Sequence, residues 1–96
     1  MVCEELVLRN PLGLHLRPAG VLCTEALRFS SKILIRYENR EANAKSILGI
    51  LSTGIKYQSR FEVVCEGEDE KEALVAIKKL FEEGLGEVLE DESLES

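Results

Sequence analysis

The chain has 96 residues, of which 45% are hydrophobic and 31% are charged. This length fits one domain with one modest core, and the composition is that of an ordinary globular protein rather than a disordered one. No apolar run is long enough to span a bilayer, and the N-terminus lacks the basic start and apolar stretch of a signal peptide. We therefore expect a cytoplasmic protein with no membrane insertion.

The formal net charge of −6 argues against a nucleic-acid partner. Five of the 18 acidic residues lie in the last ten positions, 87–96, which contain no basic residue. The remaining 13 acidic residues nearly balance the 12 basic ones, so the body of the chain is close to neutral. We predict one domain over residues 1–87 and a flexible acidic C-terminal tail over residues 88–96.

Hydrophobic periodicity predicts seven elements in the order strand, helix, strand, strand, helix, strand, helix. The expected ranges are 2–8, 18–29, 32–37, 41–44, 46–52, 61–65 and a last helix that starts near Asp69 and stops before Gly84. Pro18 fits the first turn of its helix, Ser46 is an expected N-cap, and Asp69 with Glu72 has the spacing of a capping box. This order favours an α+β fold, in which helices cover one face of an antiparallel sheet.

Three cysteines, Cys3, Cys23 and Cys65, are widely separated and form no CxxC or Cys/His cluster. Reduced thiols that serve as small core residues are the expected interpretation, with a redox or metal role as the alternative. We expect no metal site and no cofactor, because the chain has a single histidine and no Gly-rich phosphate loop.

That single histidine lies just before the first predicted helix, in the stretch Asn10-Pro-Leu-Gly-Leu-His15-Leu-Arg17-Pro18-Ala19. The first N–H groups of a helix lack internal partners and, with the helix dipole, favour an anion. A phosphoryl group on His15 would meet those donors, and Arg17 would add a fixed charge with paired N–H groups. Attack requires a neutral imidazole, and the partial positive charge of the same helix end is expected to disfavour imidazolium. A cap or a partly buried loop residue is the simpler alternative.

Three stretches of the sequence give a sharper interpretation. Gly13-Leu14-His15-Leu16-Arg17-Pro18-Ala19 resembles the active-site motif of the histidine-containing phosphocarrier family HPr, which serves the bacterial phosphoenolpyruvate-dependent sugar phosphotransferase system. The stretch from Lys45 to Ile55 is similar to the second signature of that family, and Gly84-Leu85-Gly86-Glu87 is similar to its usual ending. The resemblance runs from Val2 to about Glu87.

The resemblance implies an open-faced β-sandwich of four antiparallel strands and three helices. It implies a monomeric, stoichiometric phosphocarrier rather than an enzyme. Enzyme I, charged by phosphoenolpyruvate, would phosphorylate His15 at Nδ1 with the assistance of Arg17, and the A components of sugar permeases would receive the group. A carrier of the nitrogen-related branch of the system is an alternative, because the motifs do not separate the two branches.

The resemblance also implies a docking surface for partner proteins, made of five side chains: Leu16, Val21, Ile47, Leu48 and Leu51. The short helix 46–52 cannot bury Ile47, Leu48, Ile50 and Leu51 together, and exposed apolar patches mark interfaces. Without the resemblance, core packing would be the ordinary interpretation of these residues.

Ser46 has two possible roles. As an N-cap it needs no further function. By resemblance, Ser46 is where a dedicated kinase, with its phosphorylase, regulates the carrier in some bacteria, and a phosphate there would place negative charge beside the docking surface. A regulatory binding module controlled by Ser46 phosphorylation is therefore the second function that we consider.

Overall fold

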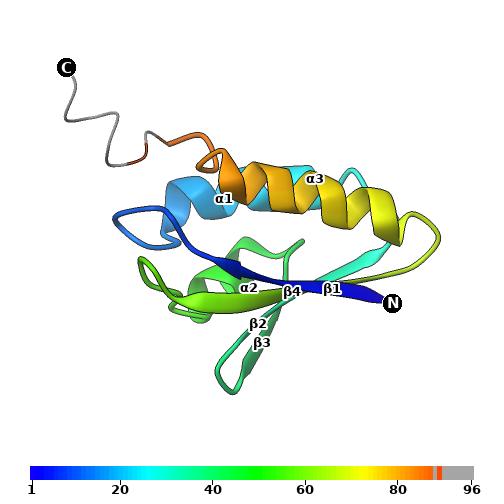
Figure 1. The fold of residues 1–96 in the computed structure, drawn as a ribbon, viewed down its shortest axis with the longest axis horizontal. Helices are drawn as coiled ribbons and strands as arrows, with labels where there is room; N and C mark the ends of the chain where they lie inside the picture. The colour runs from blue at the N-terminus through cyan, green and yellow to red at the C-terminus, as the bar shows by residue number, and fades with distance from the viewer. Residues whose placement is uncertain (88, 90–96) are drawn as a thin grey trace.

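The computed structural model describes residues 1–87 and 89, so the acidic tail predicted over 88–96 lies outside the described residues except for Leu89. The strands are β1 (Val2–Val7), β2 (Lys32–Tyr37), β3 (Arg40–Asn43) and β4 (Arg60–Glu66), and the helices are α1 (Leu16–Ala26), α2 (Ile47–Ser52) and α3 (Glu70–Glu82). The strands form one antiparallel sheet in the order β1-β4-β2-β3. All three helices lie on one face of it (Figure 1), which confirms the α+β open-faced sandwich.

The core lies between the covered face of the sheet and the three helices. Alternation along β2 and β4 places one set of side chains inward, and these residues pair across the sheet as Ile33 with Cys65 and Ile35 with Val63. The helices close the core with stripes at helical spacing, and these buried residues are Ala19, Leu22 and Ala26 of α1 and Ala73, Ile77 and Phe81 of α3. The rings of Phe61 and Phe81 lie 4.8 Å apart between β4 and α3.

Several element boundaries differ from the expected ones, by one to three residues each. Helix α1 begins at Leu16 rather than residue 18, which makes Pro18 its third residue. Proline is tolerated there because the N–H groups of the first turn have no carbonyl partner within the helix. The same helix ends at Ala26, and Phe29 beyond it packs against the core. Strand β3 begins at Arg40, because the positive φ of 56° at Glu38 makes a two-residue turn between Tyr37 and Arg40.

The three cysteines differ in burial. Cys23 and Cys65 are buried and unpaired, as expected, and burial raises the pKa of the Cys65 thiol to about 11. The expectation of a core role is wrong for Cys3, which is exposed. Side chains alternate along β1, so Cys3, opposite Val64, points to the uncovered face of the sheet. No helix among the described residues has the length and apolar character needed to cross a membrane.

The predicted capping box of α3 is wrong, although Asp69 does precede the helix. The Asp69 carboxylate makes no hydrogen bond to the backbone of its own helix. It accepts hydrogen bonds from the backbone N–H groups of Ser30 and Ser31, at 2.9 Å each, and from the Ser31 hydroxyl. Asp69 therefore fastens the connection between α1 and β2 to the start of α3.

These hydrogen bonds, the Ser31 hydroxyl first among them, lower the pKa of Asp69 from 3.8 to about 2. A lowered carboxyl pKa stabilises the fold above the unfolded value, and this contribution is lost as pH falls through the folded one. We predict that Asp69→Asn lowers the free energy of unfolding at pH 7, and that the difference from wild type shrinks between pH 4 and pH 2, measured by urea denaturation.

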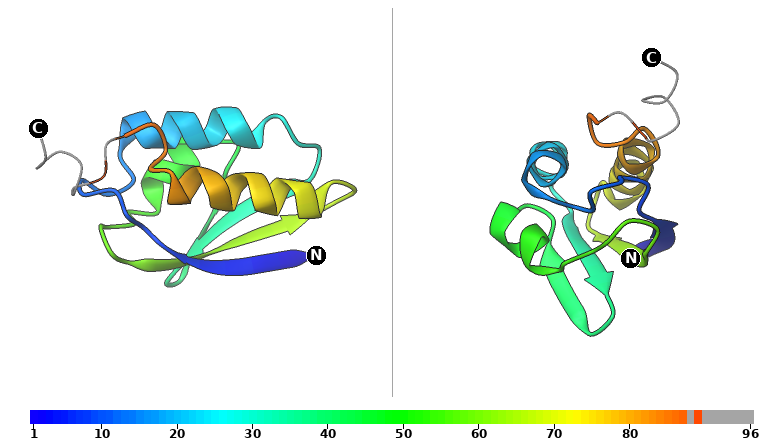
Figure 2. Two further views of the ribbon diagram at one scale, coloured as in Figure 1. Left: turned by 45° about the horizontal axis from the view of Figure 1, so that its top comes forward. Right: turned by 90° about the vertical axis from the view of Figure 1, so that its left-hand side faces the viewer.

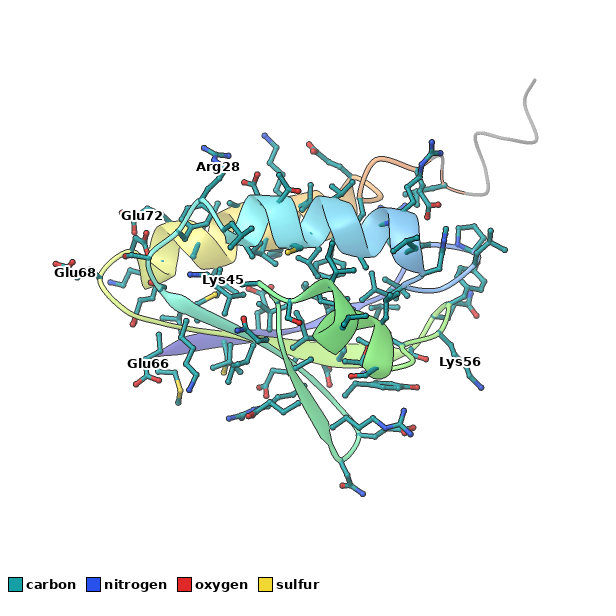
Figure 3. All side chains as sticks on the ribbon, turned by 180° about the vertical axis from the view of Figure 1, so that it is seen from behind. Arg28, Lys45, Lys56, Glu66, Glu68 and Glu72 are labelled. Carbon is teal, nitrogen blue, oxygen red and sulfur yellow. The ribbon has the colours of Figure 1, made fainter. Side chains whose placement is uncertain are left out.

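Glu68→Gln is the matched control, because Glu68 is the exposed neighbour that points away from the rest of the molecule (Figure 3). It removes the same charge without removing a hydrogen bond to the Ser30–Ser31 backbone. Equal losses of stability in the two variants at pH 7, or a difference that stays unchanged at pH 2, would contradict the role given to Asp69.

Candidate functional site

His15 is the N-cap residue of α1. Its backbone is extended, with φ −89° and ψ −168°, and its carbonyl accepts the first hydrogen bond of the helix from Ala19 N at 2.9 Å. The backbone N–H groups of Leu16 and Arg17 precede that bond in the first turn, where a helix offers donors to an anion. The side chain of His15 is 37% exposed and makes no capping hydrogen bond, so the imidazole is open to solvent beside these donors.

A close approach of two loops holds the segment that carries His15. Leu14 N donates to Ile55 O at 3.1 Å, and both side chains are buried. Gly13 has φ +79°, and a Cβ atom at this position would stand 3.0 Å from Ile55 O. Glycine is therefore needed here for both its conformation and its small size, and it keeps the chain before His15 against residues 54–57.

The end of α3 is a tight turn that brings the following residues toward α1. Gly84 N donates to Phe81 O at 3.1 Å and Leu85 N to Leu80 O at 3.0 Å, which is the Schellman arrangement of a helix C-terminus. Gly84 has φ +92°, and Leu85 is fully buried in spite of a positive φ of 53°. Burial of Leu85 fixes this turn, and Figure 2 shows the segment after α3 lying beside the start of α1.

Glu87 reaches the His15 ring from this turn. Its Oε2 lies 2.8 Å from His15 Nε2, and its Oε1 accepts a hydrogen bond of 2.8 Å from Asn10 Nδ2. Asn10 is fully buried, and its Nδ2 also donates to Gly84 O at 2.8 Å. Arg9 Nη1 donates to Glu82 O at 2.9 Å. Four polar contacts thus tie the loop before α1 to the end of α3.

Arg17 is exposed in the first turn of α1 and lies next to the same contacts. With Glu87 it lines a shallow hollow of about 310 Å³, which Pro11, Leu12 and Gly86 complete. A second hollow, of about 460 Å³, borders His15 on the side of residues 54–57. Arg17 and His15 therefore line two different hollows, although they lie only two residues apart at the start of α1.

The predicted docking residues lie on α1 and α2, around the start of α1. Leu48 is 79% exposed, Leu16 65% and Ile47 38%, whereas Ile50 is fully buried, which confirms that α2 leaves apolar side chains uncovered. Val21 and Leu51 are partly buried and also pack against the core. A hollow between the two helices is lined by Arg17, Gly20, Val21, Thr24, Glu25, Ile47 and Leu80.

Ser46 is the N-cap of α2, as predicted. Its Oγ accepts a hydrogen bond from Gly49 N at 3.1 Å, and its side chain is partly buried. The neighbouring Lys45 extends beneath the end of α1 (Figure 3), where its Nζ donates to Phe29 O at 2.6 Å. The Ser46 hydroxyl is thus occupied in a structural role and lies one residue before the exposed Ile47 and Leu48.

Two residues of the site, Asn10 and Glu87, could not be assigned a role in advance. They lie 77 positions apart, and only the packing of α3 beside α1 brings them together. Gly84 and Gly86 marked the helix end but not the direction of the chain after it. Within the described residues, no three side chains of the His, Cys, Asp or Glu type gather as a metal ion would require.

Comparisons with known proteins match this chain to one family. A family model described as the PTS HPr component phosphorylation site matches residues 2–83. Phosphocarrier protein HPr of Lysinibacillus sphaericus is 41% identical over 83 residues, which are 86% of this chain and 94% of that protein. The structure of HPr-C-His from Thermoanaerobacter tengcongensis has a TM-score of 0.88 and 39% identity, and the match covers 93% of this chain and 100% of that one.

Another relative of known structure is Crh of Bacillus subtilis, described as a catabolite repression protein with a swapped domain in a dimer. It has a TM-score of 0.71 and 35% identity, over 93% of this chain and 99% of that one. The family match, the sequence identity over most of both chains and the shared fold lead to one conclusion. This chain belongs to the HPr family of phosphocarrier proteins of the phosphotransferase system.

Proposed function

We propose that this protein is a stoichiometric phosphocarrier, not an enzyme, whose domain comprises residues 1–87. In this proposal Nδ1 of His15 accepts a phosphoryl group from Enzyme I charged by phosphoenolpyruvate, and the A components of sugar permeases then receive it. The observation that carries the proposal is the exposed His15 ring at the start of α1, beside the Leu16 and Arg17 N–H groups. The carrier would act in the cytoplasm as a monomer.

Phosphoryl transfer requires the protein to position the nucleophile and to stabilise negative charge. Covalent activation contributes little. The first-turn donors supply the helix-end interaction, and Arg17 supplies a fixed cation with parallel N–H groups. Because α1 is held by the core through Ala19 and Leu22, these donors keep their positions as the phosphoryl group arrives and leaves.

Partner proteins would dock on the apolar surface around His15. Leu16, Ile47 and Leu48 are exposed there, and Val21 and Leu51 border them. The hollow between α1 and α2 gives this surface a concave centre next to Arg17. A partner seated on it would cover His15 and exclude water from the phosphoryl group during transfer.

The alternative function is a regulatory binding module controlled by phosphorylation of Ser46, or a carrier of the nitrogen-related branch. The position of Ser46 favours the regulatory version, because a phosphate on its Oγ would stand at the start of α2, next to Ile47 and Leu48. The relative Crh is described as a catabolite repression protein. A kinase and a phosphorylase acting on Ser46 are the partners that this alternative requires.

The first prediction from the proposed function concerns His15, which is the single histidine of the chain. Incubation with phosphoenolpyruvate and Enzyme I should add one acid-labile phosphoryl group per chain, and His15→Ala should abolish it, as measured by intact-protein mass spectrometry. A reaction without Enzyme I is the control. Label that persists in His15→Ala would defeat the assignment, and acid-stable label on Ser46 from an ATP-dependent kinase alone would favour the regulatory alternative.

The second prediction concerns Arg17. Arg17→Lys keeps the charge but loses the parallel pair of donors, so phosphoryl transfer should slow by about tenfold, which is about 1.4 kcal/mol. Rapid-quench measurement of transfer from Enzyme I would give the rate. Arg28→Lys is the matched control, because Arg28 is an exposed arginine just beyond the other end of α1. Equal rates for wild type and Arg17→Lys would rule out paired donation by Arg17.

The third prediction concerns the docking surface. Leu48→Ser should raise the dissociation constant for Enzyme I about tenfold, because a buried leucine contact in an interface is worth about 1–2 kcal/mol. Its effect on stability should stay within about 0.5 kcal/mol, since the side chain is 79% exposed. Val75→Ser removes an apolar side chain that is 68% exposed on α3 and should leave the dissociation constant unchanged. Isothermal titration calorimetry gives the values, and equal weakening by both variants would place docking elsewhere.

A further inference from the structure

The Glu87 carboxylate joins two side chains that are remote in sequence. Its Oε1 accepts from Asn10 Nδ2, and its Oε2 lies 2.8 Å from His15 Nε2. The side chain of Glu87 is only 16% exposed, and Asn10 is fully buried. This is a partly enclosed hydrogen-bond chain from amide to carboxylate to imidazole, in which water competes little for the carboxylate.

The side-chain amide of Asn10 can adopt only one orientation in this series of hydrogen bonds. Its Nδ2 donates to Gly84 O and to Glu87 Oε1, at 2.8 Å each, and both of these atoms are acceptors. Rotation of the amide by half a turn would set its carbonyl oxygen against two acceptors and lose both hydrogen bonds. The turn after α3 is fixed in its place by the buried Leu85. Glu87 therefore approaches His15 from a fixed direction.

We propose that Glu87 is a positioning residue that holds the His15 ring in the tautomer with its proton on Nε2, and that Asn10 orients Glu87 for this task. An ionised carboxylate only accepts hydrogen bonds, so Nε2 has to donate. A neutral imidazole carries one ring proton, which leaves Nδ1 with its lone pair. This inference rests on the proposed function, in which Nδ1 is the attacking atom.

The tautomer determines which nitrogen attacks and where the proton and the charge lie during the transfer step. The Nδ1 lone pair forms the new bond to phosphorus, and the bond from phosphorus to the donor group breaks, with its electron pair leaving on the donor. The proton stays on Nε2, so the ring gains a positive charge that Glu87 Oε2 faces at 2.8 Å. Because Glu87 contacts Nε2, the carboxylate does not occupy the place of the phosphoryl group on Nδ1.

An amide at position 87 should reverse the tautomer. In Glu87→Gln the amide oxygen has to face the Asn10 donor, so the amide NH₂ faces His15 Nε2, which then accepts and leaves the ring proton on Nδ1. Substituting an orienting carboxylate by its amide misplaces the proton in this way in other histidine sites. We expect ¹⁵N spectra of the neutral ring to show protonated Nε2 in wild type and protonated Nδ1 in Glu87→Gln.

The same variant should accept the phosphoryl group from Enzyme I about tenfold more slowly, because the attacking lone pair is blocked in its main tautomer. Glu87→Ala should lie between wild type and Glu87→Gln in both measurements, since it leaves either tautomer open. Glu83→Gln, an equal charge change at the exposed end of α3, should match wild type. Backbone amide spectra of each variant would confirm that it is folded.

A Glu87→Gln protein with the tautomer and labelling rate of wild type would overturn the inference. So would a Glu83→Gln protein that is slowed equally, because the effect would then come from net charge alone. If Enzyme I fails to label wild type, the proposed function fails instead. The ring spectra of the unphosphorylated protein would still show whether Glu87 selects the tautomer.

Discussion

The apolar face of the antiparallel sheet determines where every other part of this protein lies. Ile33, Ile35 and Val63 are fully buried on it, and α1 and α3 have to cover them with their own apolar stripes. The two helices run in opposite directions across this face (Figure 1). The start of α1 and the end of α3 therefore meet at one end of the molecule, so the location of the candidate site is a consequence of core packing.

Three segments converge at that end, and each contributes something that the others cannot. The loop before α1 carries His15, residues 54–57 support this loop through Ile55 O, and the turn after α3 supplies Glu87. Tight backbone conformations at Gly13 and Gly84 make the convergence possible. The His15 ring stays 37% exposed while the residues around it are buried or hydrogen-bonded, so the ring is both accessible and held in place.

The order of the elements, the buried stripes and the Ser46 cap could be predicted from the sequence, because periodicity and capping depend on residues a few positions apart. The same local logic failed for Asp69, whose carboxylate binds Ser30 and Ser31, 39 and 38 positions earlier in the chain, instead of its own helix. It also could not place Glu87 beside His15, since that contact spans 72 positions. Such long-range polar contacts follow only from how the helices pack.

The Schellman turn after α3 links the stability of that helix end to the contacts of Glu87 with His15 and Asn10. The Leu85 amide is bonded to Leu80 O, and the buried Leu85 side chain lies two residues before Glu87. Fraying of the last turn of α3 would therefore withdraw Glu87 from the ring and release Asn10 at the same time. The hydrogen-exchange rate of one backbone amide, that of Leu85, thus reports how often the site opens in the folded protein.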